Sequence, residues 1–90
     1  MVFLAGSQRF TERDNDIDLN DAEPFKWYLV GTTNANKPEG TSGQLGFVFT
    51  INVGRHGDTA YRIQLYFGWG SSHNFMRRIE AGAWSEWYQL

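Results

Sequence analysis

The chain of 90 residues contains no cysteine, only two prolines and only two histidines. Without cysteine it can form no disulfide scaffold, no thiolate zinc site and no cysteine nucleophile. Small domains that lack such staples often gain stability by oligomerisation, which we therefore expect here. The histidines, His56 and His73, do not stand at metal-ligand spacing, so the sequence predicts no zinc site.

Long hydrophobic runs and a strong charge of either sign are also missing. The apolar stretch at residues 1–4 is far too short for a signal peptide or a membrane span, so we expect no membrane insertion. The net charge is −2 and no basic run occurs, which argues against a nucleic-acid partner. Residues 1–24 hold six acids and two arginines, an imbalance too small to imply an electrostatic partner.

Aromatic residues, by contrast, are abundant, with four tryptophans, four tyrosines and seven phenylalanines. A single domain of this length buries only about 60–70% of its unfolded surface and needs a rich core. Large rings supply such a core, and they also make good contact surfaces. We therefore expect some of these rings to serve a subunit or ligand interface.

The N-terminal part differs in composition from the rest. Residues 5–18 are mainly glycine, serine, glutamine and alternating charges, which cannot close a core. We interpret residues 1–17 as a connector or as an arm packed on a neighbour, and residues 18–90 as the folded domain. A single helical turn is expected near residues 19–23, because Pro24 blocks a longer helix.

Alternation of large apolar residues predicts β-strands over most of residues 18–90. The predicted strands cover residues 25–30, 45–53, 61–69, 74–79 and 84–90. One face of the two central strands is rich in large side chains, which we expect to be buried: Leu45, Phe47, Phe49, Ile51, Val53, Tyr61, Ile63, Leu65, Phe67 and Trp69. The fold class is therefore all-β, a small antiparallel meander or sandwich, with a long exposed loop over residues 31–44.

Candidate catalytic groups are isolated from one another. Ser71 and Ser72 stand beside His73, but the nucleophile-elbow pattern is absent. Glu80 and Glu86 flank the last turn, yet a small meander offers nothing to bury one of them and raise its pKa. The sequence thus predicts no catalytic residues, no cofactor and a non-enzymatic role.

The acidic segment Asp14–Asp21 has part of the pattern of a calcium-binding loop. Asp14, Asp16, Asp18 and Asn20 stand at the first, third, fifth and seventh places of an EF-hand loop. The sixth and twelfth places, however, hold Leu19 and Phe25 instead of glycine and glutamate. We predict no metal site and interpret the segment as a solvated turn, while a cation site completed by other loops stays open.

Several aromatic and basic residues are candidates for ligand contacts. Trp69 lies beside a glycine-serine turn and suits stacking on a sugar, whereas Tyr66 points away from the face of Leu65 and Phe67. Arg77 shares a face with Phe75 and Ile79. Either its aliphatic part is buried and its guanidinium is paired within the chain, or the side chain contacts a ligand. Trp84 and Trp87 lie three residues apart, so in a regular strand their side chains point to opposite faces. Both can be buried in one core only if the strand bulges or twists between them.

The chain resembles the pyocin-knob type module of bacteriophage tail fibres, tail spikes and related bacteriocin fibres. The resemblance covers residues 18–90, and the Gly-x-Trp-Ser-x-Trp ending is its most specific part. At the strand entrance the family usually has a glycine, whereas this chain has Phe25-Lys26. The segments that carry the resemblance are Asp18-Leu19-Asn20, Trp27-Tyr28, Asn36-Lys37-Pro38, Tyr61-Arg62-Ile63-Gln64-Leu65-Tyr66, Phe75-Met76-Arg77-Arg78 and Gly82-Ala83-Trp84-Ser85-Glu86-Trp87.

This resemblance implies a β-rich module in a trimeric fibre of an extracellular virion appendage, with host attachment as its role. The expected partners are further copies of the chain and a bacterial surface polysaccharide. The residues that we expect to contact such a glycan, chosen as exposed aromatic and polar groups, are Tyr66, Trp69, His73 and Arg78. Two alternatives stay open: a purely structural or oligomerisation module of a fibre, and an accessory domain of a depolymerase tail spike.

Overall fold

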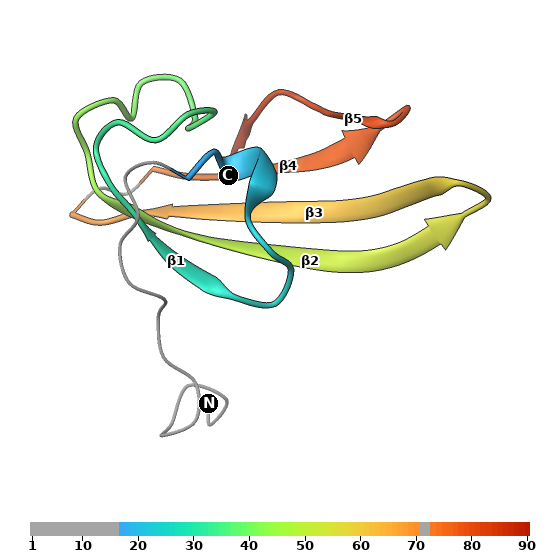
Figure 1. Ribbon diagram of the computed structural model, residues 1–90. Coiled ribbons are helices and arrows are strands. Elements are labelled where there is room, and N and C mark those ends of the chain that lie inside the picture. The colour runs from blue at the N-terminus through green and yellow to red at the C-terminus, as the bar shows by residue number, and fades with distance from the viewer. Residues whose placement is uncertain (1–16, 71–72) are drawn as a thin grey trace.

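The computed structural model describes residues 17–70 and 73–90, which form one antiparallel β-sheet (Figure 1). The strands follow the order β1-β2-β3-β4-β5, and β6 also pairs with β4. Their bounds are β1 Trp27–Val30, β2 Gly46–His56, β3 Thr59–Gly68, β4 Asn74–Glu80, β5 Ala83–Trp84 and β6 Tyr88–Gln89. The 3-10 helix η2, Leu19–Asp21, precedes them. The all-β prediction and the single helical turn are confirmed, while the predicted arm, with Asp14 and Asp16, lies outside the described residues apart from Ile17.

The strand boundaries differ from the predicted ones at two places. Strands β2 and β3 pair from Gly46 to His56, with a register shift between Asn52 and Gly54, so only Gly57 and Asp58 remain as the turn. The predicted last strand is broken at residues 85–87 into β5 and β6. This break has a consequence for the candidate site, because it frees Trp84 and Trp87 from the alternation of a regular strand.

The buried face of the sheet is opposite to the predicted one. Val48, Thr50, Gln64 and Tyr66 are fully buried. We call their side of the sheet the covered face, because η2 and the 31–45 loop lie over it (Figure 1). The other side, here called the aromatic face, consists of half-buried side chains: Trp27, Leu29, Phe47, Phe49, Ile51, Ile63, Leu65, Phe67 and Met76.

The prediction was wrong because alternation shows which residues share a face, but not which face the rest of the chain covers. Within the described ranges, no second sheet and no helix packs on the aromatic face. The buried cluster instead joins η2 to the covered face of the sheet and consists of Leu19, Ala22, Tyr28, Val30, Val48 and Tyr66. Phe75 and Trp87 pack against this cluster.

The sequence predicted that the loop over residues 31–44 is simply exposed. The structure shows instead that the 31–45 loop is held by internal hydrogen bonds. The Nζ atom of Lys37 donates to the carbonyl oxygens of Gly31 (2.9 Å), Thr41 (2.9 Å) and Gln44 (2.5 Å). Asn34 is buried, accepts a hydrogen bond from the amide of Gly31 and donates one to the carbonyl of Ile17. These polar side chains hold the loop against η2 and so shape the region described next.

Candidate functional site

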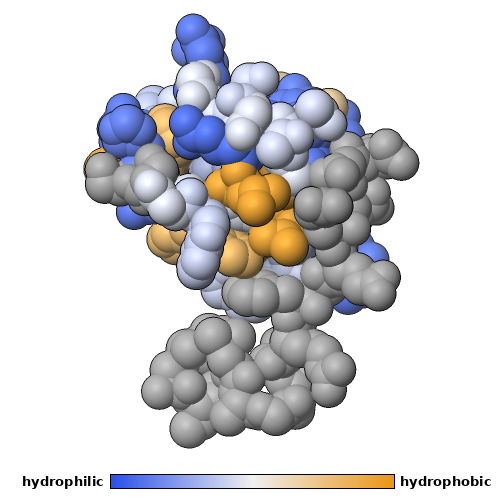
Figure 2. Space-filling model, turned by 90° about the vertical axis from the view of Figure 1, so that its left-hand side faces the viewer, coloured by the Kyte–Doolittle hydropathy of each residue, from blue (hydrophilic) through white to orange (hydrophobic). Residues whose placement is uncertain are grey.

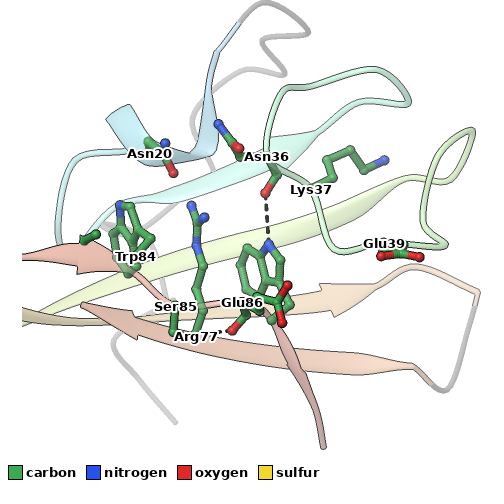
Figure 3. Close-up of a pocket in the computed structure, with 10 residues that line it drawn as sticks. Asn20, Asn36, Lys37, Glu39, Arg77, Trp84, Ser85 and Glu86 are labelled. Atoms are coloured by element: carbon green, nitrogen blue, oxygen red, sulfur yellow. Dashed lines mark hydrogen bonds between the residues drawn. The ribbon is translucent and has the colours of Figure 1, made fainter. Parts of the chain in front are cut away.

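The candidate ligand site is a groove of about 680 Å³ where η2, the 31–45 loop and the C-terminal segment meet above β4 (Figure 3). We call it the Arg77 groove, because the guanidinium of Arg77 lies at its centre. Figure 3 shows this guanidinium beside the Trp84 ring, pointing toward Asn20 and Asn36. The other lining residues with exposed or aromatic side chains are Glu39, Ala83, Glu86 and Trp87.

Arg77 is held between two indole rings. Its Cζ atom lies 4.4 Å from the ring centroid of Trp84 and 4.6 Å from that of Trp87. Both rings can flank one side chain because the strand is broken between them, at residues 85–87. In a regular strand, a bulge would be needed to bring both tryptophans to the same side. Here the strand break has that effect.

The guanidinium of Arg77 is fixed in position, but its hydrogen-bonding capacity is only partly used. The Nε atom donates to Oε1 of the buried Gln64 at 2.8 Å. The Nη2 atom is buried and has no hydrogen-bond partner. Burial lowers the pKa of Arg77 to about 10, an effect that the charge of Asp18 opposes, so the group stays cationic at neutral pH.

The wall of the groove is built by hydrogen bonds between distant segments. Oδ1 of Asp18 accepts from the amide of Asn20 (2.8 Å) at the start of η2 and from Nδ2 of Asn36 (2.6 Å) in the loop. The indole Nε1 of Trp87 donates to the carbonyl of Asn36 at 2.9 Å, the contact dashed in Figure 3. Because these bonds pre-form the groove, a ligand meets rings and polar groups that are already oriented.

Two of the four predicted contact residues lie together. Trp69, which is 68% exposed, and His73 line a second hollow of about 490 Å³ with Gln44, Leu45 and Gly70. The Trp69 ring meets the Phe47 ring edge-on at 5.8 Å. This hollow lies outside the Arg77 groove, since the two share no lining residue.

The other two predicted residues lie elsewhere. Tyr66 points away from Leu65 and Phe67 as expected, but that face is the covered one and its ring is fully buried. Tyr66 therefore offers no surface to a ligand, which corrects the prediction. Arg78 is exposed, pairs with Glu80 at 2.8 Å and lies over the Tyr88 ring at 5.5 Å, apart from both hollows.

The sequence reasoning missed the Arg77 groove as a ligand site. Its partial signals were the Trp-x-x-Trp spacing of Trp84 and Trp87 and the arginine in the preceding strand. Residues 17–70 and 73–90 bring no three histidine, aspartate or glutamate side chains together as a metal site, while Asp14 and Asp16 lie outside them. In the same ranges no helix is long and apolar enough to span a bilayer.

Compared with protein-family models, curated proteins and solved structures, the chain has no match.

Proposed function

We propose that this chain is a non-enzymatic attachment module of the phage tail-fibre type, carried outside the cell on a virion appendage, which binds a bacterial surface glycan in the Arg77 groove. The observation that supports the proposal best is the pairing of two indole rings with exposed amide and carboxylate side chains around one groove. Sugar rings offer C–H faces to aromatic rings and hydroxyl groups to amides and carboxylates.

The proposed role is binding and not hydrolysis of the glycan. The carboxylates that line the groove, Glu39 and Glu86, are both exposed. A glycosidase needs one carboxylic acid that is shielded from water so that it keeps its proton at neutral pH. Incubation of the chain with capsular polysaccharide should leave the polymer length unchanged by size-exclusion chromatography, and shortening would overturn this part of the proposal.

A glycan array, followed by calorimetry on the strongest ligand, tests where the glycan binds. The exposed rim residues give suitable variants, Asn20→Ala and Glu86→Ala, because neither side chain belongs to the buried cluster. We expect each to weaken binding at least about fivefold, the loss of one hydrogen bond, without a change in melting temperature. Trp69→Ala, in the second hollow, is the matched control and should bind normally. If Trp69→Ala weakens binding while Asn20→Ala and Glu86→Ala do not, the glycan binds in the second hollow instead.

A second candidate function, assembly of a fibre, is favoured by the aromatic face. The most exposed large hydrophobic residues lie on or around this face. Phe25, Trp69, Tyr88 and Leu90 lie on it or at its edges, and Val53 and Tyr61 lie at the end of the β2–β3 hairpin. Figure 2 looks at one end of the molecule, where hydrophobic side chains reach the surface among polar ones. Monomers rarely expose large contiguous apolar patches.

The size of this surface fits an interface between copies of the chain. An aromatic side chain offers about 150–250 Å², so the exposed parts of Phe25, Tyr61, Trp69 and Tyr88 sum to roughly 450 Å². The half-buried rows of the aromatic face add to this area, and one partner of a stable complex buries about 800 Å². The proposed assembly is a homo-oligomer, with a trimer implied by the family resemblance, and its solution mass tests it.

A further inference from the structure

Arg77 presents an unusual combination of burial and charge. Its residue surface is only 4% exposed, and its guanidinium is cationic at neutral pH. Within the part of the chain that the structure describes, the ion pairs join Lys26 to Glu23 and Arg78 to Glu80, and none reaches Arg77. A buried charge without an ion-pair partner is strongly unfavourable, so its retention needs a reason.

The protein compensates this charge only in part. The two indole rings stabilise the cation by cation–π attraction, since its Cζ lies over the face of each ring. Gln64 accepts the Nε hydrogen, while the buried Nη2 keeps its hydrogen atoms without an acceptor. The remaining hydrogen-bonding capacity therefore lies at the Nη edge of the guanidinium, because its Nε already donates to Gln64.

This edge is directed into the groove. Figure 3 shows it pointing toward the space between Asn20 and Asn36, and Arg77 itself lines the groove. A guanidinium held flat, with its Nε fixed, presents a planar fork that matches a carboxylate in the same plane.

The charges around the groove narrow the ligand further. Asp18, Glu39 and Glu86 stand near its rim, whereas the Nζ of the one lysine in the lining, Lys37, is engaged by three loop carbonyls. A dianion such as phosphate, or a densely charged polymer, would be repelled more strongly by these carboxylates than a hydroxyl-rich ligand that carries a single carboxylate. Hydroxyl groups on that ligand can pair with the amides and carboxylates of the rim.

We propose that the Arg77 groove recognises an acidic saccharide, with the sugar carboxylate placed in the plane of the Arg77 guanidinium between Trp84 and Trp87. This inference rests on the proposed function, since it names the class of glycan that the groove takes. The carboxylate supplies a counter-charge in direct contact with the guanidinium, whereas among the described residues no carboxylate forms an ion pair with it and Asp18 acts only through its charge. The exposed side chains of Asn20 and Glu86 then contact the sugar hydroxyls.

The test compares each acidic oligosaccharide with its carboxyl-reduced form, in which the carboxylate has become a CH2OH group. A panel of uronate- and sialate-containing oligosaccharides is titrated into the full 90-residue chain by calorimetry and by NMR of the Arg77 Nε–Hε resonance. We expect at least one acidic form to bind at least about tenfold more tightly than its reduced form, to shift this resonance, and to weaken as salt rises. Inorganic phosphate should shift the resonance far less.

The variants separate a role in binding from a role in folding. Arg77→Lys keeps the charge but loses the planar fork, and should remove most of the preference for the acidic form. Arg78→Lys on the same strand is the control and should retain the preference. If Arg77→Lys fails to fold, the Nε–Hε shift in the unchanged chain still decides the question.

The outcomes distinguish this inference from the function on which it rests. Equal affinity for acidic and reduced forms would refute the acidic ligand and leave glycan binding intact. A shift of equal size with inorganic phosphate would also refute it, because the groove would then be a general anion site. Absence of binding to every saccharide, acidic or neutral, would refute the proposed function together with the inference.

Discussion

On the covered face, the structure leaves no room for a side chain at Gly46. A Cβ atom at this position would overlap the Cζ and hydroxyl oxygen of Tyr66, whose ring is fully buried. The glycine thus lets a large ring lie against the backbone of the neighbouring strand. We expect Gly46→Ala to lower the free energy of unfolding by about 1–3 kcal/mol, measured by urea denaturation, because overpacked cores shift their side chains.

A matched control for this prediction lies on the same strand. Val53, which is 60% exposed, offers Val53→Ala, with an expected change of less than about 0.5 kcal/mol. An equally small effect of Gly46→Ala would show that Tyr66 moves freely, and the packing described for the covered face would then be wrong.

The Tyr66 hydroxyl makes stability depend on pH in the alkaline range. It is buried without a hydrogen-bond partner, and burial raises its pKa, an effect that the nearby Thr41 side chain opposes only in part. The unfolded chain therefore releases this proton at lower pH than the folded chain. The contribution of Tyr66 to stability is full below pH ~10, the unfolded value, and falls as the pH rises above it.

Tyr66→Phe should remove this alkaline loss and leave stability at pH 7 unchanged or raised, because it deletes a buried hydroxyl that has no partner. Melting temperatures between pH 7 and pH 11 provide the measurement. Tyr61→Phe, at a 41% exposed position, is the control and should keep the alkaline loss. If both variants behave like the parent chain, Tyr66 does not contribute to the pH dependence.

At the scale of elements, the 31–45 loop depends on Lys37. Its ammonium group donates to three carbonyl oxygens, and burial lowers its pKa. Lys37→Met should destabilise the chain by about 1.5–3 kcal/mol, because these carbonyls lose a charged donor. Amide hydrogen exchange should become faster at Gly43 and Gln44, whose backbone amides donate to the carbonyl oxygens of Thr32 and Thr41 respectively.

The exposed Lys26, which forms a surface ion pair with Glu23, provides the control Lys26→Met. This variant should lose less than about 1 kcal/mol, as surface ion pairs do. Equal exchange in both variants would indicate that the loop is held by its other hydrogen bonds.

The elements themselves could largely be predicted from sequence, whereas their covered side could not. Alternation along β2 and β3 is a local property, and it correctly grouped Phe47 with Phe49 and Leu65 with Phe67. Which group is buried depends on where η2 and the 31–45 loop fold back, and that depends on polar contacts over long sequence distances. The bond from Gln64 Nε2 to the carbonyl of Leu19 is one of them, and hydrophobic patterns do not encode it.

At the scale of the whole molecule, the candidate site could not be predicted because it combines segments that are far apart in sequence. Asn20 belongs to η2, Asn36 to the long loop, and Trp87 to the C-terminal segment. Parity placed Trp84 and Trp87 on opposite faces, and only the strand break brings both rings to Arg77. The fold-class prediction needed periodicity alone, but the site needs the tertiary contacts that close the groove.

The aromatic face leads to a prediction about the assembled molecule, and Phe25 is the residue that tests it. Phe25 has a left-handed backbone, with φ of 63°, although its ring is 56% exposed and meets Phe49 only at its edge. An L-residue in this conformation costs roughly 1–2 kcal/mol, and glycine adopts it without that cost. A strained and exposed aromatic residue is better explained by contact with another copy than by stability of one chain.

Phe25→Gly should therefore have opposite effects on folding and on association. The free energy of unfolding of the dilute chain should change by less than about 1 kcal/mol, because relief of strain offsets the lost ring contact. Self-association, measured by sedimentation over a range of concentrations, should weaken at least about tenfold, as expected when an aromatic anchor leaves an interface. The neighbouring variant Lys26→Ala should associate normally. A chain that stays monomeric at every concentration, or a Phe25→Gly variant that associates as before, would exclude this face as the contact between copies.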